Sequence, residues 1–169
     1  KFRSDIRQIP NPIDLSSSIY RHRKTARPLL IWARAFHQVY NPTIIPNVIK
    51  LLVAEYPSIK ISMLGPDKGD GSLARMMAIT NKLDVSENIV VVGGVEHSEI
   101  PEWLDKGDLF INTSNYDTAP RSILEAMANG LCVVSTDVGG IPYIVKNMES
   151  GILVPPGDAQ ALAEAIRLF

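Results

Sequence analysis

Short apolar runs alternate with longer amphipathic stretches along this chain, and this alternation constrains its fold more than any other feature. The runs are nearly continuous isoleucine, valine and leucine, which is typical of strands that are buried on both faces. They are PLLIWA (28–33), IKISML (59–64), NIVVV (88–92), DLFINT (108–113), LCVVST (131–136) and the short GILV (151–154). Strand, loop and helix repeated five or six times predict an α/β fold, a Rossmann-like parallel sheet flanked by helices.

The stretches between these runs predict the helices, because their apolar side chains recur at helical spacing. We expect helices in six places: before Pro57, from an N-cap at Ser72 to about Leu83, over 98–106, from near Pro120 to about Asn129, after DVGG (137–140), and from Asp158 onward.

Charge gives little indication of a partner. The chain has 169 residues, enough for one domain with a substantial core, and its net charge of −1 gives no sign of nucleic-acid binding. One basic cluster stands out, formed by Arg21, Arg23, Lys24 and Arg27. We interpret it as a solvated loop before the first strand. Contact with a membrane surface or an anionic acceptor is the alternative.

Cysteine and histidine usage points away from a disulfide or a metal site. The single cysteine, Cys132, lies in an apolar run and is expected to be a buried structural thiol. The three histidines are far apart and form no ligand motif. No apolar run reaches membrane-spanning length and no signal peptide opens the chain. We therefore expect a cytoplasmic location, with peripheral contact at the inner face of the membrane as an option.

The ligand crevice of a parallel sheet lies beyond the carboxyl ends of its strands. This rule selects the loops at 34–42, 65–71, 93–97, 114–120 and 137–141, which are rich in glycine, proline, aspartate and arginine. The stretch DTAPRSILEAMANG (117–130) places one carboxylate, Asp117, in such a loop and another, Glu125, in the following helix.

Two interpretations of this stretch are open. In the first, Asp117 or Thr118 caps the helix and Glu125 pairs with Arg121 on the surface. In the second, the first-turn amides bind phosphate, and the two carboxylates accept hydrogen bonds from vicinal hydroxyls. A nucleotide sugar carries both kinds of group, so the position of the stretch at a strand end favours the second interpretation.

Other nucleotide and hydrolase motifs are absent from the sequence. No G-x-G-x-x-G follows the first strand, and no G-x-x-x-x-G-K-[ST] occurs, which argues against a dinucleotide dehydrogenase and a P-loop NTPase. No G-x-S-x-G is present, which argues against an α/β-hydrolase.

The stretch LFINTSNYDTAPRSILEAMANGLCVVSTDVGGIPYIV (109–145) closely resembles the carboxyl-terminal domain of family 4 retaining glycosyltransferases of the GT-B fold. The resemblance covers nearly the whole chain and includes IPNPIDL (9–15), which looks like the family's interdomain linker. It implies a linker over residues 1–27, a donor-binding domain over 28–169, and an amino-terminal acceptor domain that is absent from this chain.

The resemblance also implies roles for individual residues. The family's acid-x7-acid signature falls on Asp117, expected to contact the donor hexose, and on Glu125, expected to bind the ribose. Arg34 matches the arginine that holds the diphosphate, and we expect it to act in catalysis together with Asp117. Further donor-binding residues are expected at Gly94 and Val95 along the base, and at Thr118, Arg121 and Ser122 near the sugar and diphosphate. No metal and no cofactor is implied, because the nucleotide diphosphate sugar is a substrate.

Three departures from the family pattern affect the donor site. Asp117 replaces the usual glutamate, Tyr143 replaces the glutamate of GG-x-P-E, and Val39 and Tyr40 stand where a lysine is usual. We predict that Lys68, in the loop after the second strand, replaces that lysine, and a solvated turn lysine is the equal alternative.

The function that follows is sugar transfer from a nucleotide diphosphate sugar, with retention at the anomeric carbon, to a saccharide or lipid-linked acceptor. Polysaccharide biosynthesis is the expected setting. A non-catalytic nucleotide-sugar binding module and a GT-B nucleotide-sugar epimerase are the alternatives. Because the acceptor domain is absent, this chain alone is expected to bind donor weakly and to transfer nothing.

Overall fold

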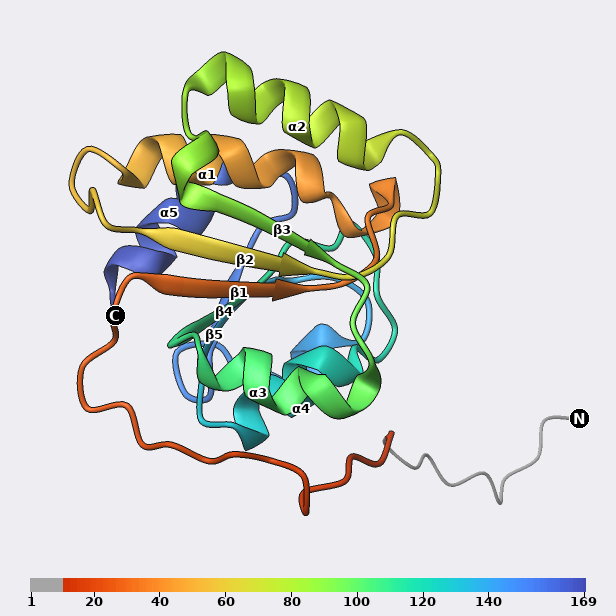
Figure 1. Ribbon diagram of the computed structural model, residues 1–169. Coiled ribbons are helices and arrows are strands. Elements are labelled where there is room, and N and C mark those ends of the chain that lie inside the picture. Colours follow the sequence, from red (N-terminus) through yellow and green to blue (C-terminus); the bar gives the residue numbers. More distant parts are fainter. Residues whose placement is uncertain (1–10) are drawn as a thin grey trace, which may run out of the picture.

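The computed structural model describes residues 11–169, which form one sheet of six parallel strands in the order β3-β2-β1-β4-β5-β6 (Figure 1). The predicted α/β, Rossmann-like parallel sheet is therefore confirmed. Each strand begins and ends within two residues of its predicted range: β1 Leu29–Ala33, β2 Lys60–Leu64, β3 Ile89–Gly93, β4 Leu109–Asn112, β5 Cys132–Thr136 and β6 Ile152–Val154.

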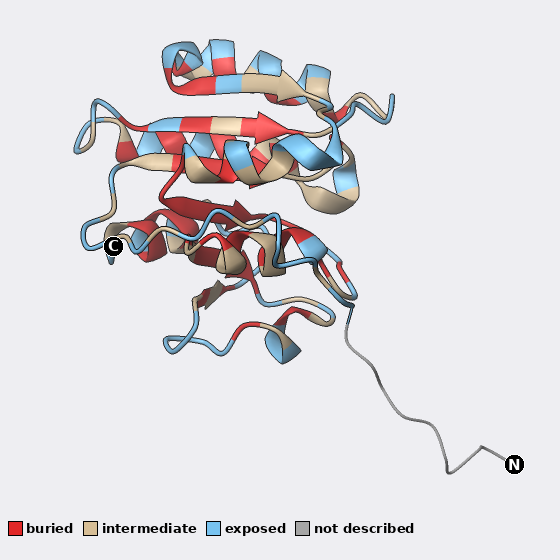
Figure 2. Ribbon diagram, turned by 60° about the horizontal axis from the view of Figure 1, so that its bottom comes forward, coloured by how far each residue is buried: buried red, intermediate tan, exposed pale blue. Residues whose placement is uncertain are grey.

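Helices cover both faces of the sheet (Figure 1). One face carries α1 (Ile45–Leu52), α2 (Ser72–Leu83) and α5 (Ala159–Arg167), and the other carries α3 (Ile100–Asp105) and α4 (Arg121–Ala128). Side chains alternate along each strand, so the sheet separates two hydrophobic cores. On β1, Trp32 packs into the core beneath α1 and α5, whereas Ile31 packs into the core beneath α3 and α4. Buried residues accordingly concentrate in the strands and on the inward faces of the helices (Figure 2).

Two helix predictions are wrong in detail. Ser72 does not cap α2: the N-cap is Gly71, at a φ of 80°, and the buried Ser72 is the first helical residue. Asp70 fixes this turn instead, since its carboxylate accepts hydrogen bonds from the Ser72 amide at 2.9 Å and from the Ser72 hydroxyl at 2.8 Å. Bonds to the backbone amide of Gln38 and to Ser72 lower the pKa of Asp70 to about 2.

The helix expected after DVGG is only a single 3-10 turn, Ile141–Tyr143. The chain reverses soon afterwards at Met148, which has a φ of 61° and donates its amide to the Gly151 carbonyl at 2.8 Å. Asn147 supports the reversal, because its side-chain oxygen accepts the Leu153 amide at 2.9 Å. These local bonds compete with helix formation and leave too few residues for an α-helix.

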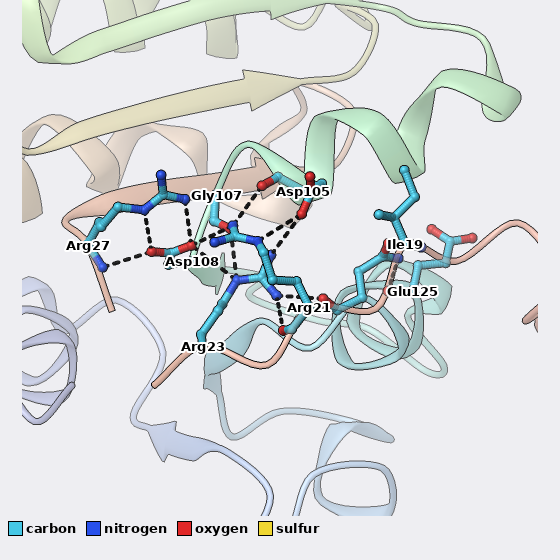
Figure 3. Close-up of polar contacts among 9 residues, drawn as sticks. Ile19, Arg21, Arg23, Arg27, Asp105, Gly107, Asp108 and Glu125 are labelled. Carbon is cyan, nitrogen blue, oxygen red and sulfur yellow. Dashed lines mark hydrogen bonds and ion pairs between the residues drawn. The ribbon is translucent and has the colours of Figure 1, made fainter. Parts of the chain in front are cut away.

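The linker segment, residues 11–27, runs without helices or strands past α3 and α4 to the start of β1 (Figure 1). The first ten residues of the predicted linker lie outside the described part of the chain. The interpretation of the basic cluster as a solvated loop is wrong for Arg23, whose side chain is 1% exposed, whereas Arg27 and Lys24 are exposed and Arg21 is partly exposed. Even so, Arg21, Arg23 and Arg27 converge on the carboxylate of Asp108 (Figure 3).

Asp108 is the centre of this ionic cluster. It is 1% exposed, and its two oxygens lie 2.8 Å from Arg27 Nε, 2.8 Å from Arg21 Nη2 and 3.1 Å from Arg23 Nε. The hydrogen bonds from Arg27, with those from Arg21, hold the pKa of Asp108 well below its usual range. The cluster attaches the linker segment to the amino-terminal ends of the central strands β1 and β4.

Candidate functional site

Residues at the carboxyl ends of β1, β2 and β3 meet side chains of α3 and α4 in one pocket of about 210 Å³. Of the residues predicted for the site, Arg34, Val95, Ser122 and Glu125 line this pocket, which we name the donor pocket after the role that the sequence resemblance predicts for it. Its other lining residues are Ala33, Ala35, Leu64, Gly65, Pro66, His97 and Ile100. Gly94 lies directly before Val95 and packs near Pro66, where an added Cβ would be 3.8 Å from Pro66 Cβ.

Arg34 directly follows β1 and is the main cation of the donor pocket. Its side chain is only 19% exposed, its guanidinium contacts Asp117 Oδ2, and it lies 4.3 Å from the ring centroid of Tyr40. Burial lowers the pKa of Arg34, but a guanidinium stays charged in proteins. Within the described residues, its buried Nε has no hydrogen-bond partner. The guanidinium therefore keeps a donor for an anionic ligand.

Asp117 is not among the residues that line the donor pocket. It is 7% exposed, and its Oδ1 accepts the Ala119 amide at 3.3 Å while its Oδ2 contacts Arg34. The structure thus brings the two predicted catalytic residues into direct contact. Because a carboxylate has about four lone-pair sites, this contact leaves Asp117 able to accept a further hydrogen bond.

The loop that carries Asp117 packs closely against two glycines. Gly140 donates its amide to the Asp117 carbonyl at 2.8 Å, and a Cβ at Gly139 or Gly140 would overlap the carbonyl oxygen of Asp117 or Thr118. Gly139 also has a φ of 56°. The glycine pair therefore allows the backbone approach that places Asp117 beside Arg34.

We expect Gly140→Ala to lower the free energy of unfolding by about 1–3 kcal/mol, because the new methyl group must displace the Thr118 carbonyl. Urea denaturation measures this change. Gly94→Ala is the matched control for stability, since its added Cβ meets its nearest neighbour at 3.8 Å. Equal losses in the two variants would contradict the role of close backbone approach at Gly140.

The amino-terminal turn of helix α4 lies at the donor pocket. Its N-cap is Pro120, so neither Asp117 nor Thr118 caps the helix, and no side chain of the described residues does so. In the first turn the Ile123 amide donates to the Pro120 carbonyl at 3.3 Å, whereas the amides of Arg121 and Ser122 come before the first hydrogen bonds of the helix. The buried Ser122 Oγ is without a partner among residues 11–169. Together with Arg34, this helix end offers hydrogen-bond donors and positive potential to an anion.

Glu125 stands at the boundary between the donor pocket and a second pocket of about 300 Å³. Its side chain is 20% exposed, with Arg121 Nη2 at 3.8 Å and His97 Nε2 at 4.0 Å from Oε1. The predicted ion pair between Glu125 and Arg121 therefore exists, but its distance is long. The Glu125 carboxylate still faces both pockets.

A family model described as "Glycosyl transferases group 1" matches residues 17–169. The chain belongs to this family. The predicted resemblance to glycosyltransferases of the GT-B fold is thereby confirmed.

Relatives and solved structures agree with this membership. The chain is 40% identical over 86 residues to the amylovoran biosynthesis glycosyltransferase AmsK of Erwinia amylovora, a match that covers 47% of this chain and 21% of AmsK. It is 34% identical over 90 residues to the lipopolysaccharide core biosynthesis mannosyltransferase LpsB of Rhizobium meliloti, covering 52% of this chain and 25% of LpsB. The chain thus spans about a quarter or less of these relatives.

The fold matches carboxyl-terminal domains of glycosyltransferases. The carboxyl-terminal domain of LpcC, a group 1 family protein of Francisella tularensis, superposes with a TM-score of 0.81 at 18% identity, covering 93% of this chain and 87% of that one. HepE of Anabaena, solved with UDP and glucose, superposes with a TM-score of 0.75 at 20% identity, covering 91% of this chain and 39% of that one.

The remaining predicted residues of this group 1 glycosyltransferase chain lie outside the donor pocket. Thr118 lines a separate, larger pocket of about 660 Å³ together with Tyr116 and Tyr143. Arg121 lines the second pocket. Lys68 is exposed, and its backbone amide donates to the Phe36 carbonyl at 3.2 Å. Its predicted role in phosphate binding stays a prediction.

Sequence reasoning missed three contributors to the site. His97 lies within one of the selected loops but belongs to no metal-ligand motif, and Tyr40 stands where the family usually has a lysine. Nothing in the sequence around His97 or Tyr40 predicts the contact that each makes. The linker residues that line the second pocket also had no signal, because they lie far from α4 in the sequence.

Cys132 is half-buried, and burial raises the pKa of its thiol. No three His, Cys, Asp or Glu side chains in residues 11–169 are grouped as a metal site would require. Across the same residues, every helix is too short or too polar to cross a membrane.

Proposed function

We propose that this chain is the donor-binding domain of a retaining, family 4-like glycosyltransferase that moves a sugar from a nucleotide diphosphate sugar to an acceptor. One observation carries the proposal: the buried Nε of Arg34 and the buried Oγ of Ser122, both without partners in the described residues, belong to the same small pocket as Glu125. Buried polar groups are nearly always paired, so this arrangement suits a ligand that brings acceptor oxygens.

The roles of the residues follow from charge. As the bond to the sugar breaks, negative charge accumulates on the leaving diphosphate, which Arg34 and the first-turn amides of α4 stabilise in a preorganised site. Glu125 accepts hydrogen bonds from the ribose hydroxyls. Asp117 holds Arg34 in place, and its remaining lone pairs accept a hydrogen bond from a hydroxyl of the donor hexose. It therefore positions the sugar and is not a nucleophile.

The acceptor is bound outside this chain. We assign residues 1–27 to a linker and 28–169 to the donor domain, with the acceptor, a saccharide or lipid-linked intermediate, on an amino-terminal domain. No metal ion takes part in donor binding in this scheme. The chain alone then binds donor weakly and transfers nothing, and the whole enzyme works in the cytoplasm, with peripheral contact at the inner face of the membrane.

A thermal-shift screen of the full-length protein against nucleotide diphosphate sugars tests this function. The HepE structures with UDP and with UDP-glucose make uridine donors the first to try. A donor at about 100 times its dissociation constant should stabilise the protein by roughly 2.7 kcal/mol. Free monosaccharides and nucleosides are the controls. Absence of a shift with every nucleotide sugar would contradict the proposed function.

A further inference from the structure

The ring of Tyr40 is the aromatic partner of the Arg34 guanidinium. Its centroid lies 4.3 Å from Arg34 Cζ, and Tyr40 is itself half-buried against the core beneath α1 and α5. A cation within about 6 Å of a ring centroid is attracted by the ring quadrupole, and the attraction grows when the pair is withdrawn from water. Because the Arg34 side chain is only 19% exposed, this contact helps to fix the orientation of its guanidinium.

Hydrogen bonds at the end of β4 hold the backbone of Tyr40 in this place. The Tyr40 carbonyl accepts the Thr113 hydroxyl at 2.7 Å, and the oxygen of that hydroxyl accepts the indole N–H of Trp32 at 2.9 Å. Trp32 is fully buried in β1, two residues before Arg34. The backbone of Tyr40 is therefore tied, through one hydroxyl, to the strand that carries its cationic partner.

Two further side chains fasten the turn that ends at Tyr40, the 3-10 turn Gln38–Tyr40. Asp70, from the loop after β2, accepts the Gln38 amide on Oδ2 at 2.8 Å. Asn115, from the loop after β4, donates from Nδ2 to the Gln38 carbonyl at 3.0 Å. The turn is thus bonded to the loops of two neighbouring strands, and the Tyr40 ring is preorganised before a ligand arrives.

We infer that Tyr40 is a positioning residue for Arg34 and that Asp70 holds Tyr40 in this role. The inference rests on the proposed function, in which Arg34 binds the diphosphate. An aromatic ring attracts the guanidinium without adding a carboxylate to the pocket, whereas a second carboxylate beside Asp117 would repel the diphosphate. Where the family pattern has a second cation, this chain has a ring that orients the first.

Tyr40→Leu in the full-length enzyme tests the positioning role. With the nucleotide sugar as substrate, kcat should fall about 10-fold, as expected when a largely buried cation loses its aromatic partner. KM should change less than about 2-fold, because the diphosphate gains much of its charge only in the transition state. Isothermal titration should show unchanged affinity for uridine, which carries no diphosphate. Tyr40→Phe keeps the ring and should retain kcat within about 2-fold.

Tyr56→Leu is the matched control for stability. Tyr56 is likewise half-buried against the core beneath α1 and α5, but it lines a different pocket, beside Pro28 just before β1. Urea denaturation should show a loss of stability in both leucine variants, whereas only Tyr40→Leu should lose kcat. This comparison separates the orientation of Arg34 from a general loss of core packing.

A double-substitution cycle tests the part assigned to Asp70. Asp70→Ala releases the Gln38 amide and should lower kcat in the unmodified protein but not in Tyr40→Leu, because residues that act through one contact are not additive. Additive losses, equal losses in Tyr40→Phe and Tyr40→Leu, or a loss of kcat in Tyr56→Leu would overturn the inference. Failure of the unmodified protein to bind any nucleotide sugar is a different result, which would overturn the proposed function itself.

Discussion

Arg34→Ala should lower turnover of the full-length enzyme by about 10²–10³-fold, the usual effect of removing one preorganised donor to developing negative charge. Arg34 is the cation whose buried Nε lacks a partner within the described residues, and it is held in place by Asp117 and Tyr40. Turnover is measured with the nucleotide sugar that the thermal-shift screen identifies.

Binding measurements separate this effect from a folding defect. UDP affinity should fall in Arg34→Ala while uridine affinity is retained, because uridine has no diphosphate. Arg34→Lys should be intermediate, since an ammonium keeps the charge but not the planar fork of donors. Arg167→Ala removes an arginine that pairs with Glu55 on the surface and should leave turnover unchanged. A parallel loss of uridine and UDP binding in Arg34→Ala would contradict the assignment to the diphosphate.

Asp108→Asn should lower the free energy of unfolding by about 3–5 kcal/mol, the usual result of breaking a buried ion pair from one side. Arg23 has a side chain that is only 1% exposed, and without the Asp108 charge its guanidinium is buried with too little compensation. Urea denaturation at neutral pH measures the loss. Asp84→Asn removes the same charge from an exposed αL position that asparagine also tolerates, and it should change stability little.

The stability difference between Asp108→Asn and the unmodified protein should depend on pH. The pKa of Asp108 is depressed in the folded state, chiefly by its hydrogen bond from Arg27. Its stabilising contribution is therefore complete above its unfolded pKa of about 3.9 and is lost as the pH falls toward the folded pKa. Unfolding free energies measured between pH 5 and pH 2 should fall less steeply in Asp108→Asn than in the unmodified protein. Identical slopes would contradict this contribution.

Local sequence was sufficient for most of the fold. The six strands lie where unbroken aliphatic runs predict them, because strands covered on both faces must be apolar at every position. The failed predictions, Ser72 as an N-cap and a helix after Gly140, share a cause. In both places a side chain two to six residues away, Asp70 or Asn147, bonds the backbone and decides the local conformation.

The candidate site was predictable in position but not in its contacts. That Arg34, Val95, Ser122 and Glu125 lie at one edge follows from the parallel sheet, whose strand ends all face the same way. That Asp117 contacts Arg34 and lies outside the pocket lining depends on the Gly139–Gly140 backbone, which is distant in sequence from Arg34. Family resemblance named the residues but contained no such geometry.

The amino-acid sequence by itself determined the α/β class and the strand positions, because these depend on periodicity and on local residue type, and its resemblance to a known family named the carboxylates and the arginine of the candidate site. Only the tertiary structure decided the fate of the basic cluster and the extent of the site. Arg21, Arg23 and Arg27 acquire their common partner, Asp108, more than 80 residues later in the chain. The linker segment likewise lines a pocket only once it is bonded to Asn129 and to Asp108. Such long-range pairs leave no mark in local sequence, because burial and charge pairing arise only when distant segments pack together.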